Sequence, residues 1–124
     1  MRYLIDTNII IDHFRGYEIS TSFFEEIENS RIKASISVIA EYELLACSKL
    51  TPQQEKQIIS FVKVFATLNI TSNIVKIAAR FRRIYNTDVV DSLIAATAYK
   101  SNSILITRNT KHFINIKEIR IKSV

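Results

Sequence analysis

Apolar residues along this chain occur either in short runs or at a spacing of three to four positions. Short runs are typical of buried strands, and the wider spacing is typical of helices that cover a sheet. The pattern predicts strands at residues 2–6, 32–35, 68–71, 103–107 and 118–122. Helices are predicted at residues 8–15, from about 20, and at 37–49, 52–66, 72–84 and 88–100.

Residues that favour helix ends mark several of these boundaries. Gly16 is expected to end the first helix, and residues 20–22, Ser-Thr-Ser, are candidate N-caps of the second. Thr51 and Pro52 are expected to open the fourth helix as its cap and first-turn proline. The inward-facing positions of that fourth helix are expected to be Ile58, Ile59, Val62 and Phe65.

The order of the elements predicts the fold class. Strands that alternate with helices form a mostly parallel sheet with helices on both faces. We therefore expect an α/β protein with three layers, α/β/α, around a central sheet of about five short strands. The chain has 124 residues, with one glycine, one proline and no repeat or linker, and it is expected to form a single domain.

Composition narrows the class of protein. Hydrophobic residues make up 48% and charged residues 23%, which is typical of a globular protein rather than a disordered one. The apolar runs are much shorter than the roughly 20 residues that cross a membrane, and residues 1–6 lack the apolar region of a signal peptide. We expect a cytoplasmic protein with no membrane association. Cys47, the single cysteine, lies in the helical apolar pattern and is expected to be buried and unreactive.

Positive charge is concentrated in the second half of the chain. Residues 1–62 carry 6 Lys and Arg against 9 Asp and Glu, a net charge of −3, whereas residues 63–124 carry 11 against 3, a net charge of +8. A basic half attracts polyanions, although a solvated basic surface explains the charge equally well. The arginines considered first as contacts with a polyanion are Arg80, Arg82, Arg83 and Arg108.

Three carboxylates, Asp6, Glu41 and Asp91, lie inside apolar stretches where a charge is unfavourable. Removing an ionised carboxylate from water costs free energy unless a cation or hydrogen-bond donors replace the hydration. Several such acids in one chain indicate a metal site. A set of oxygen ligands, with no His or Cys spacing suited to zinc, favours Mg²⁺ or Mn²⁺.

Asp6 and Asp91 also have structural interpretations. Asp6, Thr7 or Asn8 can cap the helix after the first strand, and a cap at Thr7 or Asn8 would leave Asp6 free. Asp91 continues the apolar stripe of its helix and is expected to point toward the core, but Asp88 and Asp91 also resemble a capping box. Both roles are compatible for a residue at the buried start of a helix.

The helix predicted at residues 37–49 carries two glutamates. Glu41 lies closer to the apolar face than Glu43, so we expect Glu41 to face inward and Glu43 to face solvent. The alternative is that Glu41 is a partly exposed residue on the flank of the helix.

The segment Thr107-Arg108-Asn109 follows the strand at 103–107 and would reach the same edge of the sheet as Asp6. That carboxyl edge is where ligands bind in open α/β sheets. Alone, the segment indicates only a turn. The hydroxyls of Thr7 and Thr107 could orient a ligand or a water, or could serve in caps and turns.

The ordered motifs of the chain are Leu4-Ile5-Asp6-Thr7-Asn8, Ser37-x-x-x-Glu41-x-x-x-Leu45, the segment 91–98, and Ile106-Thr107-Arg108-Asn109 followed by Phe113. In this order they resemble the motifs of PIN-domain nucleases, over essentially the whole chain. Length and spacing are most similar to those of the VapC-like toxins of type II toxin–antitoxin pairs.

This resemblance implies a metal-dependent endoribonuclease in which Asp6, Glu41 and Asp91 gather around one or two Mg²⁺ or Mn²⁺ ions. The metal would lower the pKa of a water that attacks phosphorus in line. Many PIN domains carry a further acid near the end of the fourth strand, where this chain has Asn109 with His112 close by. The supporting residues would be Thr7, Asn8, Thr107 and Asn109.

The resemblance also implies partners: an RNA substrate, drawn in by the basic half, a cognate antitoxin, and a second copy in a homodimer. A module on the same fold could instead bind nucleic acid or protein without catalysis, with the acids kept as caps. A phosphotransfer protein of the Asp–Mg²⁺ type would need two acids at the end of the first strand, and Asp6-Thr7-Asn8 offers one. Loss of RNA cleavage on replacing Asp6 or Asp91 distinguishes the nuclease from the binding module.

Overall fold

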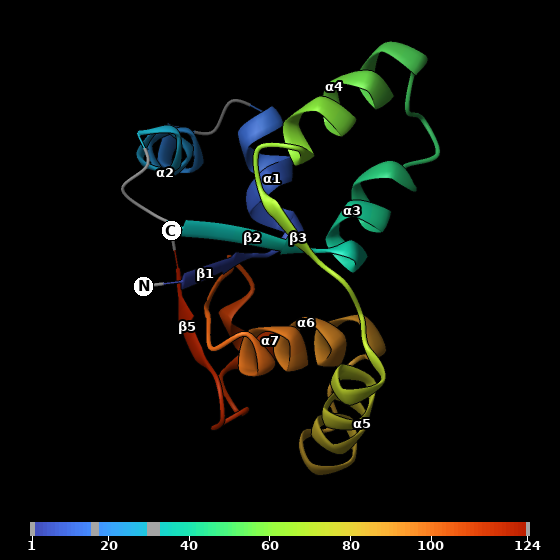
Figure 1. Ribbon diagram of the computed structural model, residues 1–124, viewed down its shortest axis with the longest axis vertical. Helices are drawn as coiled ribbons and strands as arrows, with labels where there is room; N and C mark the ends of the chain where they lie inside the picture. Colours follow the sequence, from blue (N-terminus) through green and yellow to red (C-terminus); the bar gives the residue numbers. More distant parts are fainter. Residues whose placement is uncertain (1, 16–17, 30–32, 124) are drawn as a thin grey trace.

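The computed structural model describes residues 2–15, 18–29 and 33–123, with the side chains of residues 18–21 excepted. Five strands and seven helices lie in these ranges (Figure 1). The strands are β1 (Arg2–Ile5), β2 (Lys33–Ser37), β3 (Ala66–Leu68), β4 (Ile104–Ile106) and β5 (Arg120–Lys122). The helices are α1 (Thr7–Phe14), α2 (Glu18–Glu28), α3 (Val38–Leu45), α4 (Pro52–Val62), α5 (Ser72–Tyr85), α6 (Val89–Lys100) and α7 (Thr110–Phe113).

The helices cover the two faces of one sheet, with α1 to α4 on one side and α5 to α7 on the other (Figure 1). Successive side chains along a strand point to opposite faces of the sheet, and they pack into two separate hydrophobic cores. Ile5, Ile36 and Ile106 are buried in the core on the α1–α4 side, whereas Leu4 and Leu105 are buried in the core on the α5–α7 side. The three-layer α/β/α architecture predicted from the sequence is confirmed.

All strand pairs are parallel, in the order β3-β2-β1-β4-β5. The chain leaves β1 toward β2 on one side and later returns to place β4 on the other side. A crevice at the carboxyl ends of the strands, where the order reverses, is the usual ligand site of an open α/β sheet. In this sheet the reversal lies between the ends of β1 and β4, which are followed directly by Asp6 and Thr107.

Helix boundaries in the first half differ from the sequence prediction at several points. The helix α2 begins at Glu18, so residues 20–22 lie inside it and do not cap it, and the helix end expected at Gly16 lies outside the described residues. The helix α3 ends at Leu45, four residues early, because the chain turns there to bring Leu50 and α4 onto the core. As a result Cys47 lies beyond the helix and is exposed, not buried.

Only one stripe of α4 faces the core. Ile58 and Val62 are buried, but Ile59 is 41% exposed, which corrects its expected inward position. The helix ends at Val62 because a turn then buries Phe65 and starts β3 at Ala66. The helix α5 begins at Ser72, as predicted, and its N-cap is Thr71, whose hydroxyl accepts from the backbone N–H of Ile74.

The short helix α7 was not predicted, because four residues are too few to show a helical period. No helix within the described part of the chain is both long and apolar enough to cross a membrane.

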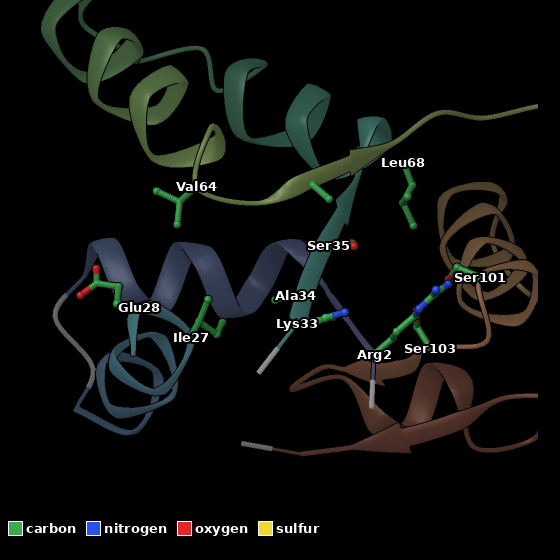
Figure 2. Close-up of a pocket in the computed structure, with 11 residues that line it drawn as sticks. Arg2, Ile27, Glu28, Lys33, Ala34, Ser35, Val64, Leu68, Ser101 and Ser103 are labelled. Atoms are coloured by element: carbon green, nitrogen blue, oxygen red, sulfur yellow. The ribbon is translucent and has the colours of Figure 1, made fainter. Parts of the chain in front are cut away.

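A hollow of about 620 Å³ opens at the amino edge of the sheet, away from Asp6 (Figure 2). Its lining comes from the starts of β1 and β2, at Arg2 and Lys33, from Leu68 of β3, and from Ser103 just before β4. This hollow lies away from the carboxyl edge, where Asp6 and Thr107 follow the ends of β1 and β4.

Candidate active site

Asp6 is held at the end of β1 by both neighbouring elements. Its backbone N–H donates to the carbonyl of Ile106 at 2.9 Å, which continues the pairing of β1 with β4. Its side chain is the N-cap of α1, because Oδ1 accepts from the N–H of Thr7 at 2.8 Å. Capping and placement at the sheet edge are therefore combined in Asp6, and neither Thr7 nor Asn8 takes over the cap.

Polar side chains from both strand ends fix the second oxygen of Asp6. Oδ2 accepts from the hydroxyl of Thr107 at 2.8 Å and from the amide of Asn8 at 3.2 Å. The Thr107 hydroxyl in turn accepts from the backbone N–H of Asn109 at 3.0 Å, and the side-chain Oδ1 of Asn8 accepts from the backbone N–H of Arg108 at 3.1 Å. The structure thus brings Asp6 and the segment 107–109 together as the sequence predicted.

Asp91 approaches the same edge from the first turn of α6. Its Oδ2 lies 3.1 Å from Nδ1 of His112, which α7 supplies from beyond β4. The side chain of Asp91 is 20% exposed, so it lies at the rim of the core rather than deep inside it. The capping box expected from Asp88 is absent, because the Asp88 side chain makes no cap hydrogen bond.

Asp6 and Asp91 repel each other when both carboxylates are ionised. Burial raises the pKa of Asp6 above its usual 3.8, and the bonds from Thr107, Thr7 and Asn8 offset that rise only in part. Burial also raises the pKa of Asp91, and the negative charges of Asp6 and Asp88 add to the rise while His112 opposes it. Such a pair is stabilised by a cation placed between its members.

These shifts predict how stability without metal depends on pH. The native Asp6 carboxyl binds its proton more tightly than the unfolded one, so its stabilising contribution is complete below pH 3.8 and is lost as pH rises through the raised native pKa. The free energy of unfolding of Asp6→Asn relative to the parent should therefore increase with pH across this window. Urea denaturation in EDTA at a series of pH values measures the difference, and a difference that stays constant contradicts the assignment.

The glutamate of α3 that contacts Thr7, the residue after Asp6, is Glu43 rather than Glu41. A carboxylate oxygen of Glu43 accepts from the Thr7 hydroxyl at 2.6 Å, although the rest of Glu43 is exposed. Glu41 is half-buried and borders a separate hollow with Val62 of α4 and Thr67 of β3. Residues two apart on a helix point about 200° away from each other, so only one of the two glutamates can face Asp6.

The residues at this edge fit a divalent cation in charge and in donor chemistry. Asp6 and Asp91 are oxygen donors whose ionised forms lack a full counter-charge. Within the described ranges no group of three or more Asp, Glu, His or Cys is arranged to hold one ion. Two carboxylates, with water and substrate phosphate filling the other positions, are nevertheless the usual protein share of a Mg²⁺ site.

Thr107 connects the two halves of the site and is fully buried. Thr107→Val would leave an Asp6 oxygen and the N–H of Asn109 without this partner, and we expect it to lower the free energy of unfolding by about 1–3 kcal/mol. Thr67→Val is the control, since Thr67 is exposed on the edge strand β3. Equal urea midpoints for the two variants would show that the Thr107 bonds do not support the site.

Two of the arginines considered as polyanion contacts have partners within the protein. Arg108 pairs with the buried Asp12 at 2.6 Å, and Nη1 of Arg82 donates to the carbonyl of Thr87 at 2.8 Å. Arg80 lies 5.9 Å from the ring centre of Phe81, and Arg83 is exposed. Arg82 and Arg108 therefore have structural roles that the sequence did not reveal.

Known proteins share this fold and sequence pattern. The family model described as PIN domain matches residues 3–119. The chain is 32% identical over 115 residues to a protein named ribonuclease VapC19 from Mycobacterium tuberculosis, covering 89% of this chain and 90% of that protein.

Solved structures show the same relation. A toxin–antitoxin complex from Klebsiella pneumoniae contains a chain with a TM-score of 0.80 and 32% identity, at 94% coverage of both chains. A structure of VapBC2 from Rickettsia felis bound to promoter DNA gives a TM-score of 0.86 at 22% identity, covering 100% of this chain and 99% of that one, which concerns the fold alone. This chain therefore belongs to the PIN-domain family, and the resemblance of its motifs to those of the VapC-like members is confirmed.

Proposed function

We propose that the protein is a metal-dependent endoribonuclease and the toxin of a toxin–antitoxin pair. The observation that carries the proposal is the convergence of Asp6 and Asp91, two carboxylates of raised pKa, at the reversal point of the sheet. The relative named ribonuclease VapC19 supports RNA as the substrate.

Asp6 and Asp91 would hold Mg²⁺ or Mn²⁺, which supplies a water of lowered pKa and a positive charge for the phosphate. Thr107, Asn8 and the N–H of Thr7 fix the orientation of the Asp6 carboxylate, so that both of its oxygens are set before substrate binds. His112, whose Nδ1 lies 3.1 Å from Oδ2 of Asp91, would fix the orientation of the Asp91 carboxylate. Partners of this kind around ligating residues commonly change activity 10- to 100-fold when removed.

Positive charge in the second half of the chain would bring RNA to this acidic site. Residues 63–124 have a net charge of +8, and this half supplies α5, α6 and α7. Phosphate binding by Lys and Arg depends strongly on salt, so we expect RNA affinity to fall as ionic strength rises.

Sequencing the RNA ends after incubation with purified protein tests the activity. New ends should appear at defined positions with Mg²⁺ or Mn²⁺ and should be absent when EDTA replaces the metal. RNA that stays intact under every metal condition would exclude the ribonuclease function and favour the binding module.

Metal binding is expected to stabilise the protein. A ligand at 100 times its dissociation constant raises the free energy of unfolding by about 2.7 kcal/mol. Thermal unfolding with increasing Mn²⁺ should show this rise for the parent and for Glu55→Gln, an exposed change on α4, but much less of it for Asp91→Asn. A Tm for Asp91→Asn that follows the parent would place the metal elsewhere.

The toxin role rests on the relatives, one of which is a toxin–antitoxin complex with 32% identity to this chain. We propose that a cognate antitoxin binds this protein and that two copies form a homodimer. Expression should arrest growth, and co-expression of the product of the neighbouring gene should relieve the arrest. Active protein that leaves growth unchanged would exclude the toxin role without affecting the ribonuclease activity, and light scattering of the purified protein measures the dimer.

A further inference from the structure

A second hollow, of about 250 Å³, opens directly beside the carboxylates. Asp91 and His112 form the side it shares with the candidate active site. Its other walls come from the end of α5, the connection to α6, α7 and the residues after α7, which lie together in the lower half of Figure 1. Anything bound there would touch the metal-binding edge.

The walls of this hollow are held in place by bonds that do not use its interior. Asn86 ends α5 in a left-handed conformation, with φ 54° and ψ 42°, and turns the chain sharply toward α6. The carbonyl of Thr87 is fixed by Arg82 at 2.8 Å. On another side the Tyr85 hydroxyl donates to Glu118. The hollow is therefore formed before a ligand arrives, which lowers the entropy lost on binding.

Three polar side chains of the lining are available to a ligand. Within the described residues, Lys111 and the side-chain amides of Asn86 and Asn115 have no hydrogen-bond or ion-pair partner. An amide offers a donor and an acceptor together, as the edge of a nucleobase does, and lysine is a common partner of phosphate. Tyr85 adds an aromatic ring to the same wall, and such rings stack on unpaired bases.

The size of the hollow limits what can fill it. Pockets for drug-sized ligands measure roughly 300–1,000 Å³, so about 250 Å³ suits one base or one nucleotide rather than a longer segment. RNA is recognised mainly through single-stranded bases that are turned out of a stack and bound on their edges.

We propose that this hollow is the subsite for one nucleotide of the RNA next to the cleaved phosphate. Lys111 contacts a phosphate, and Asn86 and Asn115 bind the edge of the base. The inference rests on the proposed ribonuclease function and adds to it a device that selects the cleavage position.

Titration with nucleotides followed by NMR tests the subsite without requiring cleavage. The probes are the four nucleoside 5′-monophosphates and inorganic phosphate, added to ¹⁵N-labelled protein with Mg²⁺. At least one nucleotide should shift the side-chain amide signals of Asn86 and Asn115, and inorganic phosphate should not. Equal shifts with phosphate alone, or no shift with any nucleotide, overturn the proposal.

Matched variants separate local contacts from general charge. Lys111→Gln should weaken nucleotide binding about tenfold, which is about 1.4 kcal/mol, while Lys100→Gln, an exposed change at the far end of α6, should bind as the parent does. Asn115→Ala is preferred to a change at Asn86, because Asn115 is exposed and Asn86 ends a helix. Unchanged affinity in both Lys111→Gln and Asn115→Ala overturns the assignment.

RNA-end sequencing then distinguishes the subsite from the function itself. Asn115→Ala should still cut RNA but with a changed preference at one nucleotide beside the cut. If the parent cuts RNA and the variant shows the same preference, only the subsite is wrong. If the parent cuts no RNA, the proposed function is wrong and the subsite falls with it. Amide shifts caused by a protein partner, with none caused by nucleotides, also reject the subsite.

Discussion

Asp6→Asn should reduce the rate of RNA cleavage by about 1,000-fold or more while leaving the fold intact. Metal catalysis supplies several kcal/mol of transition-state stabilisation, and each 1.36 kcal/mol corresponds to a factor of ten in rate. The substitution keeps the size of the side chain and an oxygen that can accept from the N–H of Thr7. Single-turnover cleavage of a labelled RNA, with circular dichroism as a check of folding, measures both parts of the expectation.

Asp91→Asn should lose activity to a similar extent, and the double variant should be little worse than either single one. Groups that act as a unit are not additive, because removing one member already abolishes the function of the other. Glu55→Gln, which removes an exposed charge from α4, should cut RNA at the parental rate. A folded Asp6→Asn protein with parental activity would refute the metal-site assignment.

The second large effect is expected at Glu43. Glu43→Gln should lower cleavage about 10- to 100-fold, because the Glu43 carboxylate fixes the Thr7 hydroxyl next to Asp6 and adds negative charge near the ion. The same RNA assay measures the rate, and the Mn²⁺ dependence of that rate should move to higher concentration.

Glu41→Gln is the matched control, since it makes the same change two residues earlier on the same helix. Glu41 borders a hollow formed with α4 and β3, so its replacement should change the cleavage rate by less than about twofold from that of the parent. The reverse result, with activity lost at Glu41 and retained at Glu43, would restore the assignment made from the sequence alone.

The pair of glutamates on α3 shows why the sequence could not identify which of them contacts Thr7 beside Asp6. The helix α3 is apolar on several sides, because it packs against α1, α4 and α6. A hydrophobic pattern locates the inward side of a helix only when the other side is polar. The direction of each glutamate was therefore decided by how α3 lies against α1, which places Glu43 beside Thr7.

The sequence indicates His112 only as a neighbour of Asn109. Its contact with Asp91 depends on α7, a helix of four residues whose period is too short to read, and on the pairing of β4 with β1. The contacts of Arg82 and Arg108 could not be predicted for a similar reason. Nothing in the pattern of charges along the chain indicates that Arg108 lies beside Asp12, or that Arg82 lies beside the Thr87 carbonyl.

The sequence by itself determined the α/β class, the parallel sheet, and the place of Asp6 and Thr107 at its carboxyl edge. Those features follow from local signals, because apolar runs define strands and the end of each strand fixes which residue reaches the edge. Only the tertiary structure decided that Glu43 rather than Glu41 contacts Thr7, that His112 lies against Asp91, and that a hollow of about 250 Å³ opens beside Asp91 and His112. These depend on how separate helices are rotated and packed, which is set by the whole core rather than by any one segment.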